Sequence, residues 1–264
     1  MLPLFLVVFN SIFCAATFAQ NKIIQKQLTY KIGETTYQGY AAYDSSSQAI
    51  KRPVVLILPE WWGAGEYVKM RAMMLAKLGY YAFALDLYGN GKIAADVNEA
   101  KALSTPFYQN PKLAYDNINA AMAMLAKQSQ ADFRNTAAIG YCFGGSMLIQ
   151  AVKMGLVLKG MVSFHAGLAG APAEAGMIKT PMLICHGGAD LFVSAEDVAA
   201  FRKNMDDVSA EYQFISYPNA THAFTNPQAT AIGKKFNLHI AYNPEADKSS
   251  WIDMMKYLAA WLKN

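Results

Sequence analysis

Residues 135–150, "NTAAIGYCFGGSMLIQ", carry the clearest indication of the fold in this sequence. Small apolar residues lead to Gly140, Cys142 follows, and two more glycines precede apolar residues at helical spacing. A buried structural cysteine needs no flanking glycines. A nucleophile on a tight turn does, because bulky neighbours would clash with the strained backbone there. Gly140, Cys142 and Gly144 form a G-x-C-x-G sequence, the thiol form of the nucleophile elbow. The stretch therefore predicts a strand, a sharp turn that carries Cys142, and a helix.

Strand and helix patterns alternate along the rest of the chain. Apolar or alternating runs predict strands at 26–32, 36–43, 52–60, 80–89, 137–141, 159–165, 180–187 and 211–218. Helical spacing predicts helices at 65–79, 92–104, 111–129, 144–154, 195–206 and 248–263. Because such alternation implies right-handed crossovers, we expect an α/β fold, with a mostly parallel twisted sheet and helices on both faces. Ligands bind such sheets at the carboxyl ends of the strands.

The composition of the 264 residues fits one globular domain over residues 20–264. Hydrophobic residues make up 54% and charged residues 16%, which is too apolar for a disordered chain. The net charge of +4 is spread without a basic run, so we expect no nucleic-acid partner. The sequence has no HExxH motif and no close pair of histidines. We therefore expect neither a metal nor another cofactor.

The first segment, residues 1–19, differs from the rest of the chain. It carries no charged side chain, is rich in Leu, Val, Phe and Ile, and has small residues at Thr17 and Ala19 that fit a signal-peptidase site. We expect a signal peptide over 1–19 and a protein that is exported, either periplasmic or secreted. After cleavage it would have no stable membrane association. An uncleaved anchor is the alternative, because the basic residue that usually leads a signal peptide is absent.

Polar side chains follow several of the predicted strands, where ligands are expected. They are Glu60, Asp86, Cys142, Asp190 and His222. The order cysteine, aspartate, histidine supplies a nucleophile, an acid and a base. In this hypothesis His222 acts as general base and later as general acid, and Asp190 fixes its tautomer. Asp86 is expected to anchor a turn by hydrogen bonding.

The helix that begins after Cys142 would support thiol chemistry. Its N-terminal dipole and free N–H groups favour a thiolate and stabilise an oxyanion. We expect the backbone N–H of Phe143 to be one oxyanion donor. The N–H of Trp61, in the loop after the strand at 52–60, is expected to be the second. The thiolate would attack a carbonyl and form a thioester, from which water would release the acid.

Five motifs together resemble the dienelactone hydrolase family of α/β hydrolases. They are "LPEWWG" (58–63), "DLYGNG" (86–91), "GYCFGG" (140–145), "HGGAD" (186–190) and "THAF" (221–224). The resemblance spans roughly residues 27–263. It implies an α/β-hydrolase fold and a triad at Cys142, Asp190 and His222. It also implies that Glu60 contacts the thiol in the resting enzyme and helps to activate it when substrate binds.

Two positions depart from the family's pattern. Members that cleave dienelactones hold the substrate carboxylate with two arginines, and this chain has Asn90 and Asn226 there. Asparagine cannot replace the bidentate, charged contact of arginine. We therefore expect an anionic dienelactone to be a poor substrate. Trp62, Tyr88, Asn90 and Asn226 are the expected substrate-binding residues, and Lys92 is a candidate for a carboxylate clamp placed elsewhere.

The sequence thus predicts a hydrolase that cleaves a small carboxylic ester or lactone. A thioesterase or a peptidase with the same triad is an alternative, and so is a binding protein on the same scaffold that has lost turnover. A disulfide between Cys142 and Cys185 is not favoured. His165 and His186, close to the same strand ends, are expected to be hydrogen-bonded structural histidines.

Overall fold

The computed structural model describes residues 22–46 and 50–262. The predicted signal peptide, residues 1–19, lies outside the described residues, so its cleavage and the export of the protein stay predictions.

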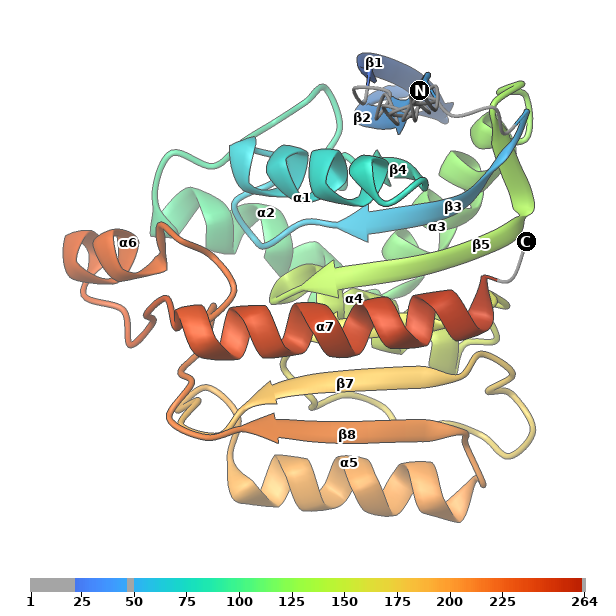
Figure 1. Ribbon diagram of the computed structural model, residues 1–264. Helices are drawn as coiled ribbons and strands as arrows, with labels where there is room; N and C mark the ends of the chain where they lie inside the picture. The colour runs from blue at the N-terminus through green and yellow to red at the C-terminus, as the bar shows by residue number, and fades with distance from the viewer. Residues whose placement is uncertain (1–21, 47–49, 263–264) are drawn as a thin grey trace, which may run out of the picture.

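One sheet of eight strands organises the described residues, in the order β1-β2-β4-β3-β5-β6-β7-β8 (Figure 1). The strands are β1 Ile23–Ile32, β2 Thr35–Asp44, β3 Arg52–Leu58, β4 Tyr81–Ala84, β5 Ala131–Tyr141, β6 Met161–Phe164, β7 Met182–Gly187 and β8 Tyr212–Tyr217. β1 pairs antiparallel with β2, and β2 pairs antiparallel with β4. The remaining neighbours, from β4 through β3 and β5 to β8 in sheet order, are parallel. The predicted α/β fold with a mostly parallel sheet is confirmed.

Helices cover both faces of this sheet. They are α1 Glu66–Lys77, α2 Val97–Gln109, α3 Lys112–Leu125, α4 Phe143–Lys153, α5 Ala195–Asp207, α6 Ala229–Phe236 and α7 Pro244–Trp261. Alternate side chains of β3 point to opposite faces. Val55 and Ile57 belong to a buried cluster with residues of α1 and α7, which Figure 1 shows in front of the sheet, whereas Leu56 and Leu58 belong to a second cluster with residues of α3, α4 and α5. Both faces are apolar, which explains the continuous apolar run of β3.

Several element boundaries differ from the sequence prediction, among them the starts of α2 and β5, and one helix was not predicted at all. Helix α2 starts at Val97 rather than at 92, because the Asp96 side chain accepts a hydrogen bond from the Glu99 N–H and caps the helix there. Strand β5 starts at Ala131 rather than at 137, and its early part pairs with β3 across a register shift. The eight-residue helix α6 was not predicted, since a helix of this length gives little periodic signal.

Candidate active site

Cys142 lies on a strained turn between β5 and α4, as the elbow sequence predicts. Its φ of 51° and ψ of −118° are a backbone conformation that non-glycine residues rarely adopt. A Cβ on Gly144 would lie 2.4 Å from the Leu58 carbonyl oxygen, and one on Gly140 would lie 2.6 Å from the Gly144 oxygen. The glycines therefore let helix α4 approach β3 and β5 closely enough to form the turn.

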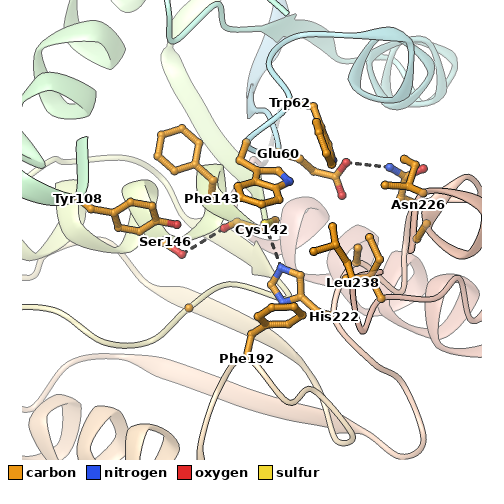
Figure 2. A pocket seen from close by; sticks show the side chains of 16 residues that line it. Glu60, Trp62, Tyr108, Cys142, Phe143, Ser146, Phe192, His222, Asn226 and Leu238 are labelled. Atoms are coloured by element: carbon orange, nitrogen blue, oxygen red, sulfur yellow. Dashed lines mark hydrogen bonds between the residues drawn. The ribbon is translucent and has the colours of Figure 1, made fainter. Parts of the chain in front are cut away.

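His222 lies between the thiol and a carboxylate. Its Nε2 is 3.0 Å from Cys142 Sγ, and its Nδ1 is 2.8 Å from Asp190 Oδ2. Figure 2 shows the imidazole directed at the sulfur. Asp190 follows β7, and its other oxygen accepts a hydrogen bond of 2.9 Å from the Phe192 N–H. The structure thus brings together the three side chains that the sequence predicts as a triad.

The charge on His222 is set by these two neighbours. Burial by itself lowers the pKa of the imidazole, but the attraction of Cys142 and the hydrogen bond and charge of Asp190 outweigh it and raise the pKa to about 10. His222 is therefore protonated at neutral pH and presents a positive charge to the sulfur.

Glu60 follows β3 and is buried against the same cavity. Its Oε2 accepts a hydrogen bond of 2.8 Å from Asn226 Nδ2 (Figure 2). Burial raises the pKa of Glu60 to about 7, and the Asn226 hydrogen bond with the charges of His222 and Arg71 offsets only part of that effect. In the described structure no hydrogen bond joins Glu60 to Cys142, so the thiol contact that the family resemblance implies stays a prediction.

The two residues that are expected to supply N–H groups to an oxyanion line the same cavity as Cys142. Phe143 is the first residue of α4 and Trp61 lies on the turn after β3, and both line the cavity. Neither N–H donates a hydrogen bond to another described residue. The carbonyl oxygen of Trp61 accepts a hydrogen bond of 2.9 Å from the Tyr88 hydroxyl, which fixes the turn.

A mainly apolar cavity of about 220 Å³ opens above Cys142. Its walls include Trp62, Phe192, Ile232, Leu238 and Ile240. Ile232 lies on α6, and Leu238 and Ile240 lie in the segment after it; the sequence analysis predicts no helix or strand in this region. The only titratable carboxyl or imidazole groups among the lining residues are Glu60 and His222.

The four predicted substrate-binding residues separate into two pairs. Trp62 and Asn226 line the cavity. Tyr88 and Asn90 do not: Tyr88 stacks behind Phe143, with ring centroids 5.9 Å apart, and Asn90 is exposed on a turn. That turn is held by Asp86, whose carboxylate accepts hydrogen bonds from four backbone N–H groups. The anchoring role predicted for Asp86 is confirmed.

A buried polar network supports the loop of His222, and the sequence analysis did not predict it. His165 Nε2 lies 2.7 Å from the Thr225 hydroxyl, so His165 is hydrogen-bonded as expected. The same hydroxyl lies 2.6 Å from that of Tyr67, and the Thr225 carbonyl accepts a hydrogen bond of 2.6 Å from Arg71. The His165 ring packs edge-on against His222, with centroids 5.4 Å apart. The Nδ1 atoms of His165 and of His186 are both buried without a partner among the described residues.

Burial and the neighbouring His222 charge hold the pKa of His165 well below its ordinary value. His165 is therefore neutral at neutral pH, and it adds no repulsion to the imidazolium beside it.

The described residues contain no group of three or more Cys, His, Asp or Glu side chains placed to hold a metal ion. Within the same ranges, no helix has both the length and the apolar character that crossing a membrane requires.

The sheet order, the strained turn after β5 and the polar strand ends define an α/β hydrolase. The chain belongs to the dienelactone hydrolase family, whose model matches residues 38–262. The predicted family is therefore confirmed, and the protein is a hydrolase with a small-molecule substrate.

Solved structures and a curated relative agree with this membership. The structure named m3DLH is 31% identical with a TM-score of 0.85, over 91% of this chain and 99% of that one. A dienelactone hydrolase-like promiscuous phosphotriesterase from metagenomic libraries is 29% identical with a TM-score of 0.84, over 90% and 98%. A Methylorubrum extorquens protein assigned as a carboxymethylenebutenolidase is 25% identical over 222 residues, 80% of this chain and 72% of its own.

Proposed function

We propose that the protein hydrolyses carboxylic esters or lactones through Cys142, His222 and Asp190. The observation that carries this proposal is the position of His222, within 3.0 Å of the thiol sulfur and 2.8 Å of the carboxylate. A nucleophile, a base and a group that orients the base are the parts that acyl transfer needs. A non-catalytic binding protein would not require this alignment.

In the proposed reaction the Cys142 thiolate attacks the substrate carbonyl carbon. The oxyanion that forms accepts hydrogen bonds from the N–H groups of Phe143 and Trp61. The tetrahedral intermediate collapses to a thioester, and protonated His222 gives its proton to the leaving oxygen. His222 then takes a proton from water, which attacks the thioester, and the carboxylic acid and the thiolate are released. Asp190 holds the imidazole orientation in both steps.

Glu60 is proposed to assist the acylation step. Its raised pKa keeps a large fraction of the carboxyl protonated near pH 7, so it is able to exchange a proton beside the thiol as substrate binds. Asn226 holds one of its oxygens, which limits its movement within the cavity.

We also propose that the preferred substrates are uncharged. The cavity walls carry no lysine or arginine, and the Asn226 amide is already hydrogen-bonded to Glu60. Lys92 is exposed, pairs with Glu99 at 3.4 Å and does not line the cavity. A substrate carboxylate would therefore lose its hydration, and the only cation among the described residues of the cavity wall, the His222 imidazolium, is already held by Cys142 and Asp190.

Kinetics with two esters of similar size test both parts of the proposal. We expect wild-type protein to hydrolyse p-nitrophenyl butyrate with a kcat/KM at least about tenfold above that for the p-nitrophenyl monoester of succinic acid, the loss expected for an unpaired charge. No hydrolysis of either ester would refute the esterase proposal. A higher kcat/KM for the anionic ester would refute the proposal that the preferred substrates are uncharged. If Lys92→Met then lost that preference, Lys92 would be the residue that binds the substrate carboxylate.

A further inference from the structure

We propose that the active-site cavity continues into a second subsite that binds the acyl chain of the substrate, and that this chain is extended, uncharged and able to form hydrogen bonds. The inference rests on the proposed esterase function and adds the substrate class. The subsite is a groove of about 480 Å³ between the α2–α3 junction, helix α4 and residues 167–171.

The groove and the cavity share three walls. Tyr108, Ser146 and Gly167 line both of them. The Ser146 hydroxyl donates a 3.2 Å hydrogen bond to the Cys142 carbonyl, which places the shared wall directly beside the reactive residue. The groove and the cavity therefore meet at these three residues, and in our proposal the substrate chain passes over them from the sulfur into the groove.

The position of His222 decides which part of the substrate enters the groove. Figure 2 shows His222 and Leu238 on one side of Cys142, and Tyr108 and Ser146 on the other. Because His222 gives its proton to the leaving oxygen, the leaving group lies on the Leu238 side, in the apolar cavity. The acyl chain then points towards Tyr108 and Ser146, which is the direction of the groove.

The lining of the groove defines the chemistry of that chain. No lining residue is charged, and the polar side chains beyond the shared wall are Gln109 and Gln150. Gln150 is buried, and its Nε2 makes only a long 3.4 Å hydrogen bond to the Ala169 carbonyl. A primary amide both donates and accepts hydrogen bonds, so its best partner is an amide or hydroxyl group in the chain. A charged chain would find no charged side chain among the described residues of the lining, and the nearby Lys153 ammonium is already bonded to the Ala171 carbonyl at 3.2 Å.

The closing experiment compares three p-nitrophenyl esters. They are the acetate, the octanoate, and the 5-acetamidopentanoate, which has a chain of similar length with an amide near its end. For wild type we expect a higher kcat/KM with the acetamido ester than with the octanoate. Gln150→Leu, which keeps the side-chain size, should lower that ratio about three- to tenfold, the effect of one lost hydrogen bond.

Two further variants keep the test decisive if Gln150→Leu folds poorly. Ala171→Trp, at the exposed rim of the groove, should lower the kcat/KM for both long esters relative to acetate, because the indole fills the groove. The matched control Gln213→Leu, exposed on β8, should leave every ratio at the wild-type value. Two results would overturn the subsite and leave the esterase proposal standing. In both, wild type hydrolyses the acetate; in the first Ala171→Trp has no effect on the long esters, and in the second wild type prefers the octanoate to the acetamido ester. Failure to hydrolyse any of the three esters would overturn the esterase function and the subsite with it.

Discussion

Cys142 and Cys185 lie near the carboxyl ends of two parallel strands, yet their surroundings differ in every respect that controls thiol chemistry. Cys185, within β7, is fully buried, and its sulfur accepts a long hydrogen bond of 3.6 Å from the Tyr217 hydroxyl. Burial raises the pKa of Cys185 to about 12, although the Tyr217 hydrogen bond opposes this. Cys142 is partly exposed, has a positive φ and faces a protonated imidazole.

Under the proposed mechanism, the comparison indicates that residue type and strand position alone do not make a thiol reactive. Reactivity depends on the strained turn that exposes the sulfur, the N-terminus of α4 behind it and a cation in contact with it. A thiol in the core without these features stays protonated and serves packing.

Replacing each cysteine by alanine is the largest test of this contrast. Cys142→Ala should lower kcat/KM for p-nitrophenyl butyrate by about a thousandfold or more, because the covalent step is lost. Cys185→Ala should keep kcat/KM close to wild type and lower the free energy of unfolding by roughly 1–2 kcal/mol. Kinetics and urea unfolding of both variants check this. Equal losses of activity would erase the distinction between the two cysteines.

Glu60 sharpens the contrast, because its buried carboxyl lines the same cavity as Cys142. The carboxyl that acts on Cys185, that of Asp253, is instead hydrogen-bonded to Tyr217. Its pKa rises from 4.5 to about 7 on folding. The folded state thus binds more protons between these values, so this group's contribution to stability falls as pH rises from about 4.5 through 7. The total change is about 3 kcal/mol.

Glu60→Gln should remove this pH dependence and slow acylation at least about tenfold. Thermal unfolding at pH 4.5 and 8 together with ester kinetics measures both effects. Glu66→Gln on α1, whose side chain is 85% exposed, is the matched control and should alter neither. A wild-type acylation rate in Glu60→Gln would remove Glu60 from the mechanism, and an unchanged pH dependence would contradict its raised pKa.

The hydrogen-bonded support of His222 gives the smallest expected effect. Thr225→Val removes the hydroxyl shared by His165 and Tyr67 and leaves two buried polar groups short of a partner. We expect a loss of about 1–3 kcal/mol in unfolding free energy and a kcat lowered only a few-fold, with KM unchanged. Thr29→Val, exposed on β1, is the control. Full wild-type stability and kcat would show that this network does not hold the His222 loop.

The fold and the centre of the site could be predicted because their signals are local. The glycines around Cys142 report a close approach of α4 to its neighbours. Asp190 and His222 follow predicted parallel strands, and the carboxyl ends of such strands share one edge of the sheet. Position along the chain was therefore enough to place the three side chains together.

The walls of the site could not be predicted in the same way, because they depend on tertiary packing. The hydrogen bond between Glu60 and Asn226 joins residues 166 positions apart, and the apolar wall comes partly from the short helix α6. Asn90 was placed at the substrate by its correspondence with the family, but the turn anchored by Asp86 leaves it exposed. Neither outcome is encoded in a local pattern.

The covalent intermediate gives the most direct test of the central claim, that the Cys142 sulfur carries the acyl group. Wild-type protein is quenched in acid during turnover of p-nitrophenyl acetate, digested, and analysed by mass spectrometry with and without hydroxylamine. We predict a hydroxylamine-labile acetyl group on the peptide that contains Cys142. An acetyl group on another residue that forms and decays at the rate of turnover would contradict the account.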